Sequence, residues 1–184
     1  MYKKLVTVHT ALAAFFLPMG LMYAITGGLY SIGNKGDYKT TEHKLTLAEP
    51  LPNELSGLVA IVEKELASRQ IAQPSGGAGV KKGGTSYYLE WTGSRLDVEL
   101  HPTADPNQAT LKLKETTTHR FFVQLHKAKG ATAFKWFAAV WMVGLVTLFL
   151  TGGLMAFTTR PYRKLAMVSG VLGVAVFAAL AMTS

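Results

Sequence analysis

The stretch from Thr118 to Phe157 constrains the fold most, because it joins an amphipathic beginning to a long apolar run. No charged side chain occurs between Phe137 and Phe157. About 20 apolar residues are enough for a helix to cross the roughly 30 Å hydrocarbon core of a bilayer. The part of the chain before this stretch is therefore expected on one side of a membrane, and the part after it must return from the other side.

A second long apolar run, Leu5 to Tyr30, is interrupted only by His9 and carries Pro18 near its middle. Lys3 and Lys4 before it resemble the basic start of a signal peptide. However, the run is too long for a typical signal peptide, and no small-x-small cleavage site follows it. We therefore predict an uncleaved transmembrane helix that is kinked at the proline.

Together these patterns predict an α-helical membrane protein with three transmembrane helices and one small extracytoplasmic α+β domain. The third helix is a Gly-, Ala- and Val-rich run near the end of the chain, and a short basic segment containing a proline precedes it. The predicted organisation is transmembrane helix 1 over 1–30, the α+β domain over 31–117, an interfacial amphipathic segment over 118–132, transmembrane helix 2 over 133–157, a basic cytoplasmic loop over 158–164 and transmembrane helix 3 over 165–184.

The orientation follows from the basic residues of the short segments, which favour the cytoplasmic side. Lys3 and Lys4 lie before the first helix, and Arg160, Arg163 and Lys164 lie between the second and the third. This predicts a multi-pass protein of a bacterial inner membrane with a cytoplasmic N-terminus and a periplasmic main domain. Lysines within the long domain do not oppose this orientation, because long segments translocate largely regardless of charge.

Composition excludes several classes of protein. All eleven acidic residues lie between Asp37 and Glu115. This middle part of the chain is a polar island between two apolar ends. The formal charge of +8 comes from dispersed lysines and arginines, which argues against nucleic-acid binding. The chain has no cysteine, and therefore no disulfide, thiolate metal site or iron–sulfur site.

The polar island reads as one helix followed by three strands. Asn53 or Ser56 is expected to cap the helix, and two strands with alternating apolar residues flank a Thr-Gly-Ser turn. Glu90, Asp97 and Glu99 are expected on the solvated faces of these strands. The apolar positions are Leu55, Leu58, Val59, Val62 and Leu66 in the helix; Tyr87, Leu89 and Trp91, then Leu96, Val98 and Leu100, in the two strands; and Leu111 and Leu113 in the third.

The segment after the island is predicted to anchor the chain structurally. Thr118 can cap a helix with an apolar stripe of Phe121, Phe122 and Leu125, which suits a helix lying at the outer membrane interface or the extended start of the second transmembrane helix. Trp136 and Trp141 would then lie near the headgroups, as in an aromatic belt.

A weak internal repeat links the first two transmembrane helices, because Thr-Gly-Gly-Leu occurs near the end of each. Small residues allow helix backbones to approach closely in a bilayer. We therefore expect Gly27, Gly28, Gly152 and Gly153 to serve in helix packing rather than in ligand binding.

These features resemble the PepSY-associated transmembrane proteins of bacterial inner membranes. The matching residues are His9 with Thr26-Gly27 in the first helix, and Phe122, Leu125-His126, Lys135-Trp136 and Thr151-Gly152 around the second. The resemblance spans nearly the whole chain and implies a minimal, three-span member with a PepSY-like external domain. It also implies three alternative roles: a haem-containing ferric-siderophore reductase component in iron uptake, an accessory membrane subunit, or a module that restrains proteases or senses a signal.

A haem b would need two axial ligands at one depth, and the candidates are His9, His126 and His119. His119 and His126 lie seven residues apart, so they rise about 10 Å along a helix and cannot both bind one iron. His9 lies at the opposite, cytoplasmic end. Met19, Met22 or Met142 are alternative ligands, whereas His43 and His101 are expected in solvated loops.

No motif for a catalytic site or a metal site occurs elsewhere in the sequence. The sequence therefore predicts a non-catalytic accessory subunit that contacts lipid and other membrane subunits or copies of itself. The haem-b electron-transfer component and the protease-restraining or sensory module remain the alternatives.

Overall fold

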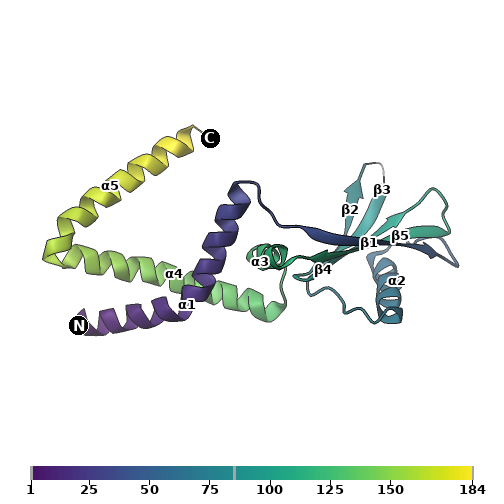
Figure 1. The fold of residues 1–184 in the computed structure, drawn as a ribbon, viewed down its shortest axis with the longest axis horizontal. Helices are drawn as coiled ribbons and strands as arrows, with labels where there is room; N and C mark the ends of the chain where they lie inside the picture. The colour runs from purple at the N-terminus through teal and green to yellow at the C-terminus, as the bar shows by residue number, and fades with distance from the viewer. Residues whose placement is uncertain (1, 85, 184) are drawn as a thin grey trace. The chain divides into compact units, whose positions relative to one another are not determined.

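The computed structural model describes residues 2–84 and 86–183, so the outermost residues of the predicted ranges, Met1 and Ser184, lie outside it. The chain divides into two compact units, Met1–Gly20 with Ala139–Ser184, and Leu21–Ala138. Within the described residues the elements are α1 Tyr2–Ser31, β1 Tyr38–Thr46, α2 Leu55–Ser68, β2 Ala78–Gly83, β3 Ser86–Trp91, β4 Leu96–Pro102, β5 Gln108–Thr116, α3 Thr118–His126, α4 Thr132–Thr158 and α5 Arg160–Met182 (Figure 1).

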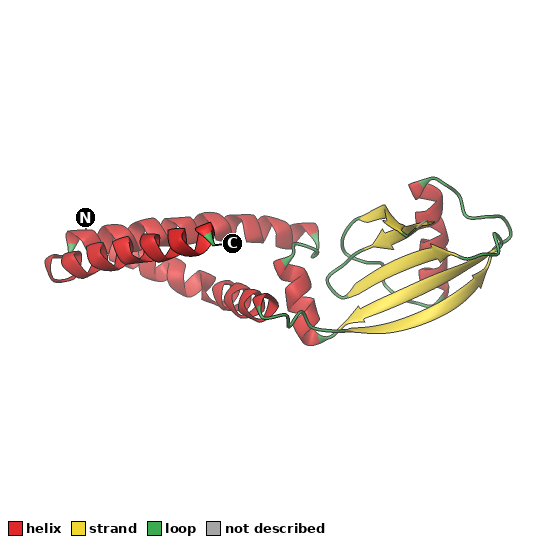
Figure 2. Ribbon diagram, turned by 90° about the horizontal axis from the view of Figure 1, so that it is seen from above, coloured by secondary structure: helices red, strands yellow, loops and turns green. Residues whose placement is uncertain are grey.

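The unit Leu21–Ala138 contains an antiparallel sheet with the strand order β1-β5-β4-β3-β2. Helix α2 covers one face of this sheet (Figure 2). The core lies between them, because the apolar side chains of both elements alternate toward the same layer. Its fully buried members are Val62, Leu66, Leu89, Val98, Leu100 and Leu111. The predicted helical protein with a small α+β domain is thus confirmed in its elements.

The sheet has two strands more than the sequence predicted. The three predicted strands are present as β3, β4 and β5, but β1 and β2 form its two edges. Leu45 is the one buried residue of β1, and β2 contains none. Edge strands that bury so little lack the apolar alternation by which a strand is recognised. Strand β2 begins at Ala78, directly after the pair Gly76-Gly77.

Two predicted helix caps were wrong. Helix α2 begins after Glu54, which makes no side-chain capping bond, so neither Asn53 nor Ser56 caps it. Helix α3 is capped by Thr117, whose side-chain oxygen accepts a hydrogen bond from the Arg120 backbone N–H at 3.3 Å. The run Thr116–Thr118 spans the start of α3, so the sequence alone could not select the threonine with extended backbone angles.

Three helices end with the same pair of backbone hydrogen bonds. At the end of α1, Gly33 N donates to Tyr30 O at 3.1 Å and Asn34 N donates to Leu29 O at 2.9 Å. Gln70 and Ala128 take the place of Gly33 after α2 and α3, and all three residues have positive φ. This Schellman geometry satisfies carbonyls that a helix end otherwise leaves unpaired.

Within the described residues, the three helices α1, α4 and α5 are long and apolar enough to cross a membrane. Pro18 lies inside α1, which continues through it. The basic segment predicted as a loop over 158–164 is largely helical, because α5 already begins at Arg160 with a proline in its first turn. A proline is accepted there since its missing N–H would have no partner in a first turn. Arg163 and Lys164 therefore lie within α5.

Candidate functional site

In the unit Met1–Gly20 with Ala139–Ser184, α1 and α4 meet along a seam of regularly spaced contacts. The α1 residues of the seam are seven positions apart. Their partners run in the opposite direction at steps of seven or eight, and the last of them, Thr159, directly follows α4. This spacing is typical of helices that pack with interlocking side chains. The contacts are Tyr2 Oη to Thr159 Oγ1 at 3.3 Å, His9 Nδ1 to Thr151 Oγ1 at 2.8 Å, and the Phe16 ring against Gly144.

The His9 contact has a defined direction. Thr151 Oγ1 donates its hydrogen to Thr147 O at 2.7 Å, so the same oxygen accepts from His9 Nδ1–H. Gly152 lies beside the ring, where an added Cβ would stand 3.4 Å from His9 Cε1. The imidazole is thus held by a Thr-Gly pair, and its Nε2 is left without a hydrogen-bond partner among the described residues.

The unit Leu21–Ala138 contains the same arrangement around His126, the last residue of α3. Its Nδ1 lies 2.7 Å from Thr26 Oγ1, and this hydroxyl donates to Met22 O at 2.6 Å. An added Cβ at Gly27 would stand 3.3 Å from His126 Cε1. We call the two arrangements, His9 with Thr151-Gly152 and His126 with Thr26-Gly27, the His–Thr–Gly clasps.

The clasps account for the close packing at two of the four glycines that were predicted to serve in helix packing. Gly27 and Gly152 each adjoin an imidazole, whereas an added Cβ at Gly28 or Gly153 would meet nothing within 4 Å. The first glycine of each pair therefore makes room for a histidine, and the second faces open space. Because the same three residue types recur with nearly equal distances, the clasp is a repeated structural element.

His126 also borders a cavity of about 330 Å³ at the end of α1. Its lining includes Tyr30 from α1, and Val123 and Lys127 from the α3 segment. The ring of Tyr23 lies 4.4 Å from the imidazole, centroid to centroid, and covers one side of it.

The other three histidines are placed differently from one another. His119 lies on α3, and its Nε2 is buried with no partner in the described part of the chain. His43 and His101 lie on strands, so their placement in solvated loops was wrong. His101 Nε2 lies 2.9 Å from Glu99 Oε2 and its ring stacks on Tyr88.

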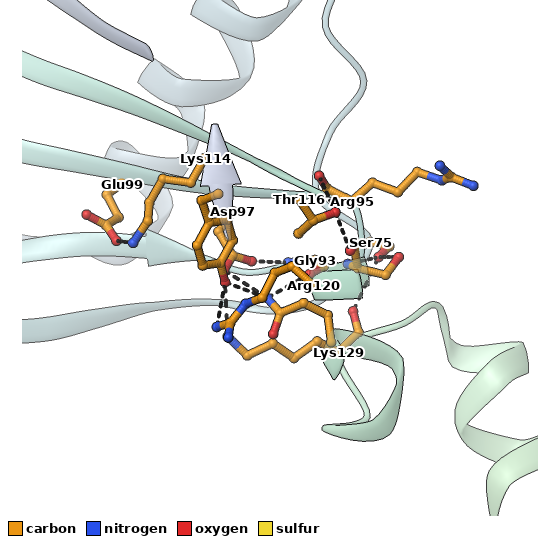
Figure 3. A network of polar contacts seen from close by, with 12 residues as sticks. Ser75, Gly93, Arg95, Asp97, Glu99, Lys114, Thr116, Arg120 and Lys129 are labelled. Atoms are coloured by element: carbon orange, nitrogen blue, oxygen red, sulfur yellow. Dashed lines mark hydrogen bonds and ion pairs between the residues drawn. The ribbon is translucent and has the colours of Figure 1, made fainter. Parts of the chain in front are cut away.

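A buried polar network fastens α3 to the sheet (Figure 3). Asp97 is only 4% exposed, although it was expected on a solvated strand face. Its Oδ1 accepts from the Gly93 backbone N–H at 2.8 Å, and its Oδ2 accepts from Tyr38 Oη at 2.6 Å and Gln124 Nε2 at 2.9 Å. Lys129 Nζ lies 3.9 Å from Oδ2. The carboxylate is thus compensated from three different parts of the unit.

Tyr38 holds the centre of this network as a neutral donor. Burial and then its hydrogen bond to Asp97 raise the pKa of Tyr38 to about 12, against the opposing effect of Arg120. Arg120 donates to Tyr38 Oη at 3.0 Å and to Lys35 O at 3.1 Å. Gly36 must approach α3 closely for this, since a Cβ there would stand 2.7 Å from Arg120 N.

Glu99, on the same sheet face as Asp97, forms a separate ion pair. Burial opposes its ionisation, but hydrogen bonds from Lys114 at 2.8 Å and from His101 outweigh this and lower the pKa of Glu99 below its ordinary value. The carboxylate is therefore a structural anion at neutral pH, and it was wrongly expected to be merely solvated.

The chemistry available at these sites is limited. In the described part of the chain no three His, Asp or Glu side chains gather as a metal ion would require. Each clasp offers one imidazole with its Nδ1 already engaged. Comparisons with family models, with curated proteins and with solved structures give no match.

Sequence reasoning identified the histidines and the Thr-Gly pairs but not that they contact one another. It missed the Asp97 network entirely. One signal was available for the clasps: each Thr-Gly pair lies near the end of one apolar helix, and each histidine lies near the start of the other apolar segment or just before it.

Proposed function

We propose that this protein is an integral membrane protein of a bacterial inner membrane that serves as a non-catalytic accessory subunit of a larger membrane complex. Its three long helices cross the bilayer, and its PepSY-like α+β domain lies on the periplasmic side. In this function the domain presents a surface to the complex.

The observation that carries the proposal is the exposure of α5. None of its residues is buried, although the helix is 23 residues long and almost wholly apolar after its first turn. Ser169, Gly170 and Gly173 also leave its surface flat enough for the close approach of another helix. A helix that its own unit leaves uncovered is suited to packing on a different subunit.

The network around Asp97 supports the same function. Its hydrogen bonds use N–H groups of Gln124 and Arg120 to fix α3 to the sheet. Gln124 is fully buried and Tyr38 is kept neutral. Groups fixed in this way stabilise a scaffold, whereas a general acid or base must be able to exchange its proton with a substrate.

A photo-crosslinking amino acid at Phe177 tests this function in native membranes. Phe177 is 75% exposed on α5, and benzoylphenylalanine retains its ring. We expect one discrete cross-linked product with a different membrane protein after illumination and none in a sample kept dark. Lipid adducts alone, or a product at twice the chain mass, together with a lone chain in native gels, would contradict the accessory function.

A haem-b electron-transfer component of ferric-siderophore uptake is the second candidate, and the direction of the clasp hydrogen bonds favours it. Because both threonines accept from Nδ1–H, the neutral imidazoles keep the lone pair on Nε2, the ring atom commonly left for a metal. When bound, a haem would supply one-electron transfer. Each clasp provides one imidazole, so a second axial ligand would have to come from a methionine or from another subunit.

An absorption spectrum decides this candidate. The full chain, expressed with haem in excess and purified in detergent, should show a Soret band that weakens in His9→Ala and His126→Ala and persists in His119→Ala. A protein without a Soret band under these conditions is not a haem protein.

A further inference from the structure

A groove opens on the α2-covered face of the sheet, where the core reaches the surface. Its floor is formed by Leu89 and Leu100, which are fully buried, and one wall by Leu58 of α2 with Pro52 before it. Val80 of β2 also lines it, and the groove has a volume of about 560 Å³. We call it the α2–β3 groove.

Exposed apolar side chains of the domain gather around this groove. Among the described residues between 37 and 117, the large apolar side chains that are well exposed are Leu55 at 40%, Val80 at 43% and Tyr87 at 62%. Val80 and Tyr87 line the groove, and Leu55 begins the helix that forms its wall. Clustered apolar exposure next to polar strands is typical of a surface that binds another protein.

The adjoining strand indicates what kind of partner fits. β2 is the last strand of the sheet, so its outer backbone edge pairs with no other strand of the described chain. An open edge can accept an extended segment as an added strand. Lys81 and Lys82 on β2 are exposed and make no ion pair in the part of the chain that is described.

The two lysines discriminate between occupants. A second copy of this chain that paired through β2 would bring lysines of both copies together, and like charges across strands are destabilising. Successive residues of a strand point to opposite faces, so Lys82 lies on the groove face with Val80 and Lys81 lies on the other face. An acidic extended segment would place carboxylates opposite Lys81, and its apolar residues, alternating with the acidic ones, would face the groove.

We propose that the α2–β3 groove and the β2 edge bind an extended, acidic segment of a partner protein, with one large apolar side chain inserted in the groove. The inference rests on the proposed accessory function and identifies the chemistry by which the external domain contacts its partner. Affinity comes from the apolar anchor and the strand edge, and selectivity comes from Lys81 and Lys82.

The test uses the full chain in nanodiscs and two labelled peptides, Glu-Val-Glu-Leu-Glu-Val and Lys-Val-Lys-Leu-Lys-Val, with binding followed by fluorescence anisotropy. We expect saturable binding of the acidic peptide only. The double change Lys81→Glu with Lys82→Glu should weaken this binding about tenfold and allow the basic peptide to bind. Tyr87→Ala should weaken the binding of the acidic peptide to the parent chain. The same change should weaken the binding of the basic peptide to the double glutamate variant.

Lys39→Glu with Lys44→Glu is the matched control, because it makes the same charge change on the opposite edge strand, β1. It should leave binding unchanged. Three outcomes would overturn the proposal. The acidic peptide could show no saturable binding, or it could bind equally weakly to the Lys39 and Lys44 control variant. The chain could also form a dimer that disappears when Lys81 and Lys82 are changed. Since the Phe177 cross-link does not involve the groove, a failure here with that cross-link intact removes the groove proposal and leaves the accessory function standing.

Discussion

Replacing Asp97 by alanine should lower the free energy of unfolding of the sheet domain by about 3 kcal/mol. The change removes the acceptor shared by Gly93 N, Tyr38 Oη and Gln124 Nε2, all within 2.9 Å of the carboxylate. The Gly93 N–H and the Tyr38 hydroxyl then lose this acceptor without gaining water, whereas Gln124 Nε2 keeps its contacts to Tyr38 Oη and Gly93 O. Asp97 is 4% exposed, so solvent cannot replace the lost hydrogen bonds.

Hydrogen exchange measured by mass spectrometry on the detergent-solubilised full chain reports this loss locally. Peptides from β4, β5 and α3 should exchange faster in Asp97→Ala, because these elements carry or contact the network. Asp97→Asn keeps one acceptor oxygen and should have an intermediate effect.

The matched control is Glu90→Ala, which removes a carboxylate from β3. Glu90 is only partly buried and makes no hydrogen bond or ion pair within the described residues. Its change should stay within about 0.5 kcal/mol. Equal exchange in the Asp97 and Glu90 variants would show that the network contributes no more than an ordinary surface carboxylate.

The Asp97 network marks the limit of what strand periodicity can predict. The alternation of apolar residues along β4 correctly predicted that Leu96, Val98 and Leu100 face the core and that Asp97 faces the other side of the sheet. It could not show that α3, which follows two elements later, covers that face at one end of the sheet. A local pattern assigns a side chain to a face but contains no information on what distant segment lies over it.

The clasps were missed for the same reason. His9 bonds a residue 142 positions away, and His126 bonds a residue 100 positions away. The sequence correctly marked the Thr-Gly pairs as places of close approach, since the absence of a Cβ is a local property. Which side chain fills the space depends on the packing of α1 against its neighbours. The strongly periodic or continuous apolar segments, in contrast, gave the helices and the inner strands directly.

Replacing Gly144 by valine should disrupt the α1–α4 seam and lower the stability of its unit by about 3 kcal/mol. Gly144 is a buried position of α4, and a Cβ there would lie 2.8 Å from Cδ2 of Phe16. Phe16 is itself 6% exposed, so its ring has little room to move aside. The clash lies one step along the seam from the His9 clasp, which should loosen with it.

Gly153→Val is the matched control on the same helix, because a Cβ at Gly153 meets nothing within 4 Å. Valine has a higher helix propensity than glycine, so this variant should be as stable as the parent or slightly more stable. The measurement is the temperature at which half of the detergent-solubilised chain remains monodisperse on size exclusion. Adding Phe16→Ala to Gly144→Val should recover part of the loss, because the smaller side chain vacates the space that valine needs. If Gly144→Val and Gly153→Val have the same stability, the two helices do not pack through this contact. The same conclusion follows if Phe16→Ala destabilises the Gly144→Val variant as much as it destabilises the parent chain.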